Sequence, residues 1–477
     1  MNAWPINQFL LSPVGEDTYL QPFLRKQRMG SFLFQYSEGS RFEYAETAEA
    51  VQGILLGEVV NPARPELSNA GLLSDMLERF WLGAESALLD YLCQCSGDFL
   101  LICLHGDRLY CFADACGQFE AFYDFDKCIL TNNPRLLPHF EAEPDALLQK
   151  YMLCIYQYTG QPGLLKLRPN HYLDFAKAAH IRYFPSAEMP VEPVDFQAAV
   201  EGIAGIMRGT LEAFARRQRT VLALTAGYDS RLLLAAGAGL ALETFTYCHA
   251  HMPEDHSDIA IGRQLAAAAA MPYGVYQYRE HVAEDKLLHF QKLYMPRMEQ
   301  AARVLEGDGI HFADALMLNG NMGEIGRSYY GVNDAANPRE LAAMIGHRGR
   351  AEVISLMDEW RAGLDLQYTG KGNLLDLFYW EERMGNWAAK AKTEMRIATR
   401  LVSPMNNFAL WRQVLGVKHA YRSTVSNKLF LAVIKALDAR LLQYPINPGR
   451  KTALMRAMVK TGIYTPYKRW YWKMKSA

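Results

Sequence analysis

The chain has 477 residues, which is too long for one ordinary core and predicts two domains. Half of the residues are hydrophobic, 21% are charged and the net charge is -1, so we expect a folded protein without nucleic-acid partners. The N-terminus lacks a basic region followed by an apolar one, and no apolar run is long enough to cross a bilayer. We therefore expect no signal peptide, no transmembrane segment and a cytoplasmic location. The eight cysteines contain no paired C-x-x-C units and are expected to be reduced core thiols.

Residues 1–185 are predicted to form an α+β domain built on antiparallel sheets with helices. Short alternating apolar runs predict strands, at residues 31–36, 99–104 and 108–113. His105-Gly106-Asp107 predicts a hairpin turn between the last two strands. Apolar residues at helical spacing predict a helix over residues 72–92.

A linker with three prolines, residues 185–193, is followed by a predicted α/β domain that spans residues 186–449. Apolar residues three to four apart predict an amphipathic helix from Phe196 to Phe214. Strands and helices are then expected to alternate, at residues 221–225, 230–238, 244–248 and 257–270. This order predicts a doubly wound parallel sheet, with a mostly helical part after Leu318.

Residues 450–477 form a separate C-terminal extension that is basic and aromatic. It contains eight Lys or Arg residues and no acidic residue, and aromatic side chains alternate with the basic ones. Two interpretations remain open: an element that docks on a membrane surface or a peptide, or a helical extension packed on the preceding domain with its lysines outward.

The turn from Thr225 to Ser230 follows an apolar strand and precedes a helix. Small residues there let the backbone approach a ligand closely, and free N–H groups at the start of the helix favour an anion. Asp229 has the wrong charge to bind phosphate, so its expected role is to hold Mg2+. The same pattern also fits a tight strand–helix turn in which Asp229 caps the helix.

This turn resembles the S-G-G-x-D-S loop of the N-type ATP pyrophosphatases, and of asparagine synthetases in particular. Thr225 replaces the serine and keeps its hydroxyl, whereas Ala226 replaces the first glycine and must therefore have a negative φ. The resemblance implies ATP and Mg2+ as cofactors. It also implies nucleotide contacts from Leu224, Thr225, Ala226, Gly227, Tyr228, Asp229, Ser230, Tyr247, Asn319 and Gly320.

Two further segments are similar to the same family. Residues 318–324 fall where asparagine synthetases carry S-G-E-G-A-D-E, which implies that Glu324 shares the metal with Asp229. Residues 444–451 are similar to the segment that delivers the catalytic lysine, which implies Lys451, although a lysine in a solvated tail fits the spacing too. Glu394 lies in the helical part that supplies substrate contacts in the family, and is either an orienting base or a member of a buried ion pair.

The first domain resembles the class II glutamine amidotransferase domain, in residues 55–61, 97–101 and 113–123. The glutaminase chemistry is expected to be absent, because position 2 is Asn2 rather than the nucleophilic cysteine. Leu56 also replaces the asparagine that donates a hydrogen bond to the oxyanion. β-Lactam synthetases and lasso-peptide cyclases lack this activity as well.

Together these resemblances imply an ATP-dependent ligase that adenylates a substrate carboxylate and transfers the acyl group to a substrate amine. The expected partners are small-molecule or peptide carboxylates and amines, and a homodimer is compatible with the family. Two alternatives stay open: an asparagine synthetase that uses ammonia, and a non-catalytic nucleotide-binding relic of the fold.

Overall fold

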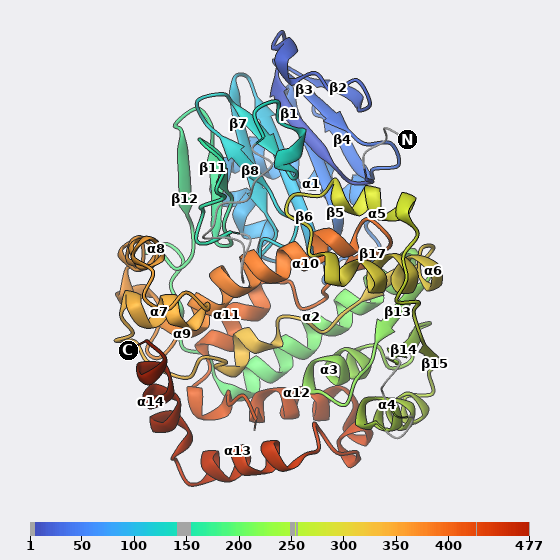
Figure 1. Ribbon diagram of the computed structural model, residues 1–477, viewed down its shortest axis with the longest axis vertical. Coiled ribbons are helices and arrows are strands. Elements are labelled where there is room, and N and C mark those ends of the chain that lie inside the picture. Colours follow the sequence, from blue (N-terminus) through green and yellow to red (C-terminus); the bar gives the residue numbers. More distant parts are fainter. Residues whose placement is uncertain (1–4, 141–153, 249–252, 254–255, 426, 477) are drawn as a thin grey trace.

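The computed structural model describes residues 5–140, 154–248, 253, 256–425 and 427–476. Antiparallel sheets fill one end of the molecule, and a parallel sheet surrounded by helices fills the other (Figure 1). The predicted fold class is therefore confirmed.

Two six-stranded antiparallel sheets form the first part of the chain. The first sheet has the order β10-β8-β9-β1-β3-β2 and contains β1 (Phe9–Pro13), β2 (Arg25–Met29), β3 (Phe32–Tyr36), β8 (Phe122–Asp124), β9 (Ile129–Thr131) and β10 (Leu165–Lys166). The second has the order β12-β11-β7-β6-β5-β4 and contains β4 (Phe42–Glu46), β5 (Val51–Val60), β6 (Ser96–His105), β7 (Arg108–Ala113), β11 (His171–Asp174) and β12 (Ala179–Arg182). The predicted hairpin turn joins β6 to β7, where Gly106 has a φ of +60°.

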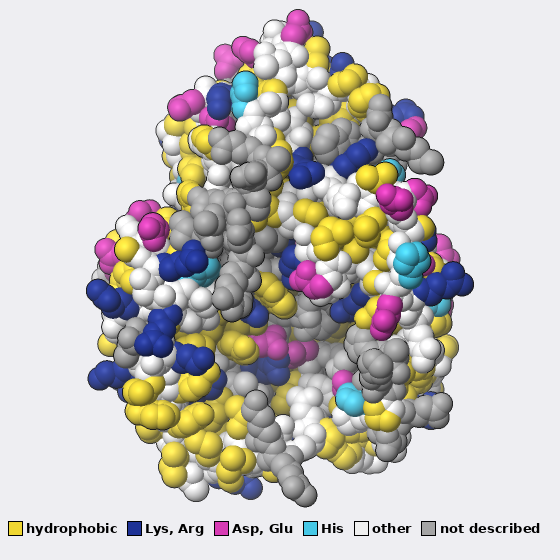
Figure 2. All heavy atoms as spheres, in the orientation of Figure 1, with side chains coloured by type: hydrophobic (Ala, Val, Ile, Leu, Met, Phe, Trp, Pro, Cys, Tyr) yellow, Lys and Arg dark blue, Asp and Glu magenta, His cyan; other side chains and the backbone are white. Residues whose placement is uncertain are grey.

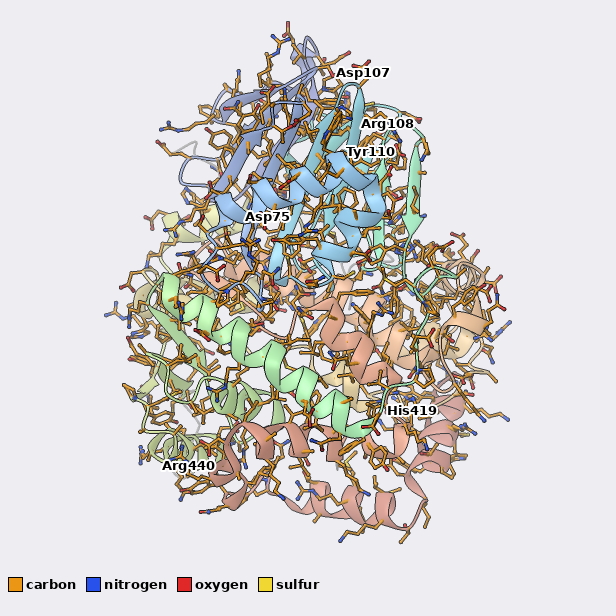
Figure 3. All side chains as sticks on the ribbon, turned by 180° about the vertical axis from the view of Figure 1, so that it is seen from behind. Asp75, Asp107, Arg108, Tyr110, His419 and Arg440 are labelled. Atoms are coloured by element: carbon orange, nitrogen blue, oxygen red, sulfur yellow. The ribbon has the colours of Figure 1, made fainter. Side chains whose placement is uncertain are left out.

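Alternating apolar side chains let the second sheet bury both of its faces. Ile54 and Leu100 pack toward Phe34 of the first sheet, whereas Val51 and Leu101 pack under α1 (Asn69–Leu92). Seen from behind, α1 lies over this sheet, with Asp75 on the helix and Arg108 and Tyr110 on β7 (Figure 3). None of the eight cysteines, all of them among the described residues, forms a disulfide, and seven of them are buried, in agreement with core thiols.

A five-stranded parallel sheet forms the centre of the second part. Its order is β15-β14-β13-β16-β17, with β13 (Thr220–Ala223), β14 (Glu243–Tyr247), β15 (Tyr273–Tyr276), β16 (Leu316–Leu318) and β17 (Arg400–Val402). Leu222 and Leu318 face one cluster of buried side chains, and Val221 and Met317 face another. Both faces of the sheet are therefore covered, as a doubly wound sheet requires.

The strand order reverses between β13 and β16. From β13 the chain adds β14 and β15 on one side, and β16 and β17 are then added on the other. Two loops therefore lie side by side at the same edge of the sheet. One follows β13 and precedes α3 (Tyr228–Ala236), and the other follows β16 and precedes the short 3₁₀ helix η5 (Gly323–Arg327). In open α/β sheets this switch point is where ligands bind.

The remaining α-helices all belong to the second part of the chain. They are α2 (Phe196–Arg217), α4 (Ser257–Ala268), α5 (Glu284–Gln291), α6 (Gly309–His311), α7 (Pro338–Met344), α8 (Ala351–Ala362), α9 (Leu374–Phe378), α10 (Ala389–Met395), α11 (Phe408–Gly416), α12 (Lys428–Asp438), α13 (Arg450–Lys460) and α14 (Tyr464–Ser476). Residues 183–195, all described, contain neither helix nor strand, which agrees with the predicted linker. Among the described residues, no helix is long and apolar enough to span a membrane.

Buried polar contacts join the two parts. Asp98 of β6 accepts hydrogen bonds from Lys392 and Arg396, at 2.7 and 2.6 Å. Asn406 donates to both Asp98 and Asp114, at 2.8 and 2.7 Å. Because an unpaired charge buried here would be costly, these contacts fix α10 relative to the second antiparallel sheet.

Candidate active site

The two loops at the switch point touch one another, and glycine makes this contact feasible. A Cβ atom on Gly320 would lie 2.9 Å from the backbone nitrogen of Ser230. A Cβ atom on Gly323 would lie only 2.0 Å from Oδ1 of Asp229. The segment 318–324 therefore packs directly on the turn 225–230, as their shared resemblance to one family of sites implies.

The turn 225–230 is held in place by its own polar groups. The Thr225 N–H donates to Oγ of Ser230 at 3.1 Å, and the Ala226 N–H donates to Asp258 at 2.9 Å. Ala226 is not among the residues with positive φ, so alanine is compatible with this position. Gly227 precedes the first turn of α3 and provides no side-chain cap, which leaves the N–H groups of this turn to an anion.

A cavity of about 510 Å³ lies at these loops. Thr225, Asp229, Ser230, Asn319 and Gly320 line it, five of the residues expected to contact the nucleotide. Its other walls include Arg297 and Arg303, which no motif indicated, and Trp387 from the helical part that was expected to supply substrate contacts. The volume is in the range of small-molecule sites, and the two guanidinium groups suit a polyphosphate.

Asp229 and Glu324 converge on a single cation. Nη2 of Arg327 donates to Oδ2 of Asp229 at 2.7 Å and to Oε1 of Glu324 at 2.5 Å. The pKa of Asp229 is raised to about 7, mainly by burial. The charge of Arg327 opposes this rise, and the charge of Glu324 adds to it. Two carboxylates that share one cation form a site with a strong demand for positive charge.

The donor set fits Mg2+. Oδ1 of Asp229 is buried without a hydrogen-bond partner among the described residues, so one carboxylate oxygen is free to take a metal. Magnesium is typically held by one or two carboxylates, with substrate phosphates and water completing its shell. No cluster of three or more His, Cys, Asp or Glu side chains occurs in the described part of the chain, so phosphate oxygens would have to complete this site.

Other residues predicted to contact the nucleotide do not line this cavity. Leu224, Ala226 and Tyr228 are buried, and the Tyr228 hydroxyl donates to the carbonyl of Val425 at 3.2 Å. Gly227 is half-buried beside the cavity-lining residues of its turn. The Tyr247 hydroxyl donates to Asp308 at 2.8 Å, so it is engaged within the protein.

The segment that precedes Lys451 lies against the turn 225–230. The Asn447 N–H donates to the carbonyl of Ala226 at 3.1 Å. The buried Arg231 of α3 donates to the carbonyls of Tyr444 and Pro445, at 2.7 and 2.6 Å. Lys451 is in the first turn of α13, and its side chain lies outside the described residues.

Glu394 belongs to a buried ion pair, the second of its two interpretations. Arg297 donates to it from its backbone nitrogen, Nε and Nη2, at 2.9, 2.9 and 2.8 Å. Lys390 lies 3.7 Å from the same carboxylate. Because Arg297 lines the cavity, Glu394 fixes the position of a cavity-lining cation.

A second, larger cavity of about 650 Å³ lies between Val332, the start of α12 and the α13–α14 extension. Lys428, Lys460 and Tyr464 line it, but none of the predicted site residues does. The smaller cavity is therefore the candidate active site, because it is the one at the switch point that combines an anion-binding turn with paired carboxylates.

Sequence reasoning missed four arginines at or beside this site: Arg231, Arg297, Arg303 and Arg327. Arg327 follows Glu324 by three residues and could have been suspected as its partner, and Arg231 directly follows the turn 225–230. Arg297 has no such signal, because its contact with Glu394 joins residues that are far apart in the chain.

Comparisons with known proteins add little to this geometry. No protein-family model and no curated protein matches the chain. One similar solved structure is described as the allosteric regulatory enzyme of purine biosynthesis, with 10% identity, a TM-score of 0.26 and coverage of 72% of each chain. Another is the glutamine phosphoribosylpyrophosphate amidotransferase from B. subtilis complexed with ADP and GMP, with 10% identity, a TM-score of 0.22 and coverage of 69% of this chain and 65% of that one. Such low TM-scores do not establish a common fold.

Proposed function

We propose that this chain is an ATP-dependent ligase that adenylates a substrate carboxylate and joins the acyl group to a substrate amine. One observation carries the proposal: Asp229 and Glu324 come from two separate loops and meet beside an anion-binding turn at the switch point of the sheet. Paired carboxylates next to a phosphate-binding turn are what a magnesium–nucleotide complex requires.

In this proposal each wall of the cavity has a separate role. The first turn of α3 and the hydroxyls of Thr225 and Ser230 bind phosphate oxygens. Arg297 and Arg303 balance the negative charge of the polyphosphate. Asp229 and Glu324 hold Mg2+, which supplies charge stabilisation at the phosphates when it is bound.

The reaction has two steps with balanced bonds. A carboxylate oxygen of the substrate attacks the α-phosphorus of ATP, the bond to the bridging oxygen breaks, and pyrophosphate leaves. An amine then attacks the acyl carbon, and AMP leaves as the amide forms. Lys451 is assigned to the charge that develops on the adenylate and pyrophosphate, and its segment is held beside the turn by Arg231.

The amine in this scheme does not come from glutamine. The Leu56 side chain has no hydrogen-bond donor, so it cannot stabilise an oxyanion. It is 1% exposed and packs in the core between the two antiparallel sheets. Asn2, at the position of the nucleophile, lies outside the described residues. A substrate that carries its own amine is therefore the simplest acceptor.

Exchange of labelled pyrophosphate into ATP tests the proposal. The purified chain is incubated with MgATP and a panel of amino acids, short peptides and other carboxylic acids, and Asp229→Asn serves as the matched blank. We expect at least one acid to support exchange, and a loss of roughly a thousandfold in the variant. Nucleotide binding without exchange for any acid would instead identify a non-catalytic relic.

A further inference from the structure

The C-terminal extension ends in a helix that has one face on the protein. Nε1 of Trp472 donates to the carbonyl of Tyr330 at 3.1 Å, and the two rings meet edge to face. Nε of Arg469 donates to the carbonyl of Val332 at 2.8 Å, and Tyr464 is buried. Lys468 adds a contact to the carbonyl of Tyr329 at 3.3 Å. α14 is therefore fixed in orientation, with this face on the protein and the opposite face toward solvent.

The outer face of this helix exposes large apolar side chains. Ile463, Tyr467, Trp470 and Met474 are 56, 39, 59 and 57% exposed, and we call these four residues the C-terminal stripe. Tyr467, Trp470 and Met474 have the spacing of a single face of α14, and Ile463 lies directly before the first residue of this helix. Leu454 of α13 is 64% exposed as well. These exposed apolar side chains do not pack against the core of this chain, which indicates that they contact another surface.

The charge around the stripe has one sign. Residues 450–477 contain eight Lys or Arg residues and no Asp or Glu. Lys460, Arg469, Lys473 and Lys475 are exposed. Hydrophobic side chains gather beside Lys and Arg at the α13–α14 end of the molecule (Figure 2). A segment that combines exposed apolar rings with basic side chains is complementary to an apolar layer with a negative boundary.

We propose that α14 docks this protein onto an anionic lipid bilayer, with the helix in the plane of the interface. Tyr467 and Trp470 would sit at the headgroup level, where aromatic side chains of this kind are favoured, and Met474 would enter the acyl boundary. The surrounding lysines can extend toward headgroup phosphates. The proposal does not depend on the adenylation chemistry, since none of the stripe residues lines the candidate active site.

Charge distinguishes this occupant from a second copy of the chain. A symmetric dimer built on the stripe would bring two extensions of eight basic residues together. Like charges at such an interface oppose association, whereas anionic headgroups neutralise them. The lipid surface is therefore the occupant that satisfies both the apolar stripe and its basic surroundings.

Sedimentation with lipid vesicles tests the proposal on the full chain. Vesicles of phosphatidylcholine alone are compared with vesicles that also contain phosphatidylglycerol, at low and high salt. We expect binding to the anionic vesicles only, weakened at high salt because the basic residues act through screened attraction. Replacing Lys460 and Lys475 by glutamine should lower the partition coefficient by about fivefold per residue.

The apolar contribution is tested with the triple variant Tyr467→Ser/Trp470→Ser/Met474→Ser. The matched control is Trp81→Ser/Leu82→Ser, which removes two exposed side chains, 45 and 73% exposed, from α1 in the other part of the chain. We expect the triple variant to lose vesicle binding at an unchanged melting temperature, and the control to bind like the original chain. Equal binding by both variants would overturn the proposal. So would a concentration-dependent dimer that the triple variant abolishes, in the absence of vesicle binding.

Discussion

Arg327 is the resident counter-charge of the paired carboxylates, and its removal gives a sharp test of the site. Its side chain is 9% exposed, and its guanidinium contacts Asp229 and Glu324, whose side chains are 17 and 30% exposed. Arg327→Met keeps much of the apolar length of the side chain but leaves two mostly buried carboxylates without a partner. Removing one member of a buried ion pair costs about 3 kcal/mol or more, which corresponds to a drop of roughly 5–10 °C in melting temperature.

Magnesium should reverse part of this loss. In the original chain a metal competes with Arg327 for the same two carboxylates, whereas in the variant it finds them uncompensated. Calorimetric melting in EDTA and in MgCl2 should therefore show a larger stabilisation by Mg2+ in Arg327→Met than in the original chain. The double variant Asp229→Asn/Arg327→Met should lose this response.

Arg25→Met is the matched control for this experiment. Arg25 pairs with Glu38, and both side chains are well exposed, at 63 and 77%, so its loss should leave the melting temperature unchanged. The assignment of a shared cation site is wrong if Arg327→Met melts like the original chain in EDTA and responds equally to Mg2+.

Three further predictions follow from other parts of the chain. Incubation with glutamine should release no glutamate above a blank, and steady release that persists through purification would contradict the loss of the glutaminase site. Lys451→Ala should slow single-turnover product formation about a hundredfold with little change in ATP affinity. Lys428→Ala, in the wall of the larger cavity, should leave product formation unchanged. If Lys428→Ala is instead the slow variant, Lys451 is not the catalytic lysine. Glu382→Gln should become more stabilising as the pH rises from 5 to 8, because burial raises the pKa of Glu382 to about 7. The unfolded chain loses this proton near pH 4, whereas the folded chain keeps it until about pH 7. The contribution of Glu382 to the free energy of unfolding, up to about 3 kcal/mol, is therefore lost as the pH rises through 7. A melting-temperature difference that does not change with pH would contradict this.

The sequence predicted the elements whose signals are local. The alternation in residues 108–113 matches β7 (Arg108–Ala113), and the helix expected over 72–92 is α1, which begins three residues earlier. β17 escaped prediction because it has only three residues and becomes a strand through its pairing with β16. Its register is a tertiary property that no local pattern encodes.

The same distinction applies to the site. Asp229 and Glu324 were paired in advance because residues 225–230 and 318–324 resemble two loops of one family, and the strand order of the structure brings these loops together. Arg297 could not be found, since its position depends on Glu394 from a distant helix. The C-terminal extension was left with two interpretations, because only the packing of Trp472 on Tyr330 decides which face of α14 is exposed.

The central claim is that a substrate carboxylate becomes bonded to the α-phosphorus of ATP. The most direct measurement uses a carboxylic acid that supports pyrophosphate exchange, labelled with oxygen-18 in its carboxyl group and incubated with ATP, the amine and the purified chain. Mass spectrometry of the nucleotide product should show AMP that carries one labelled oxygen, because the bond between the acyl carbon and that oxygen breaks when the amide forms. Label in inorganic phosphate together with ADP, or unlabelled AMP, would contradict the adenylation mechanism.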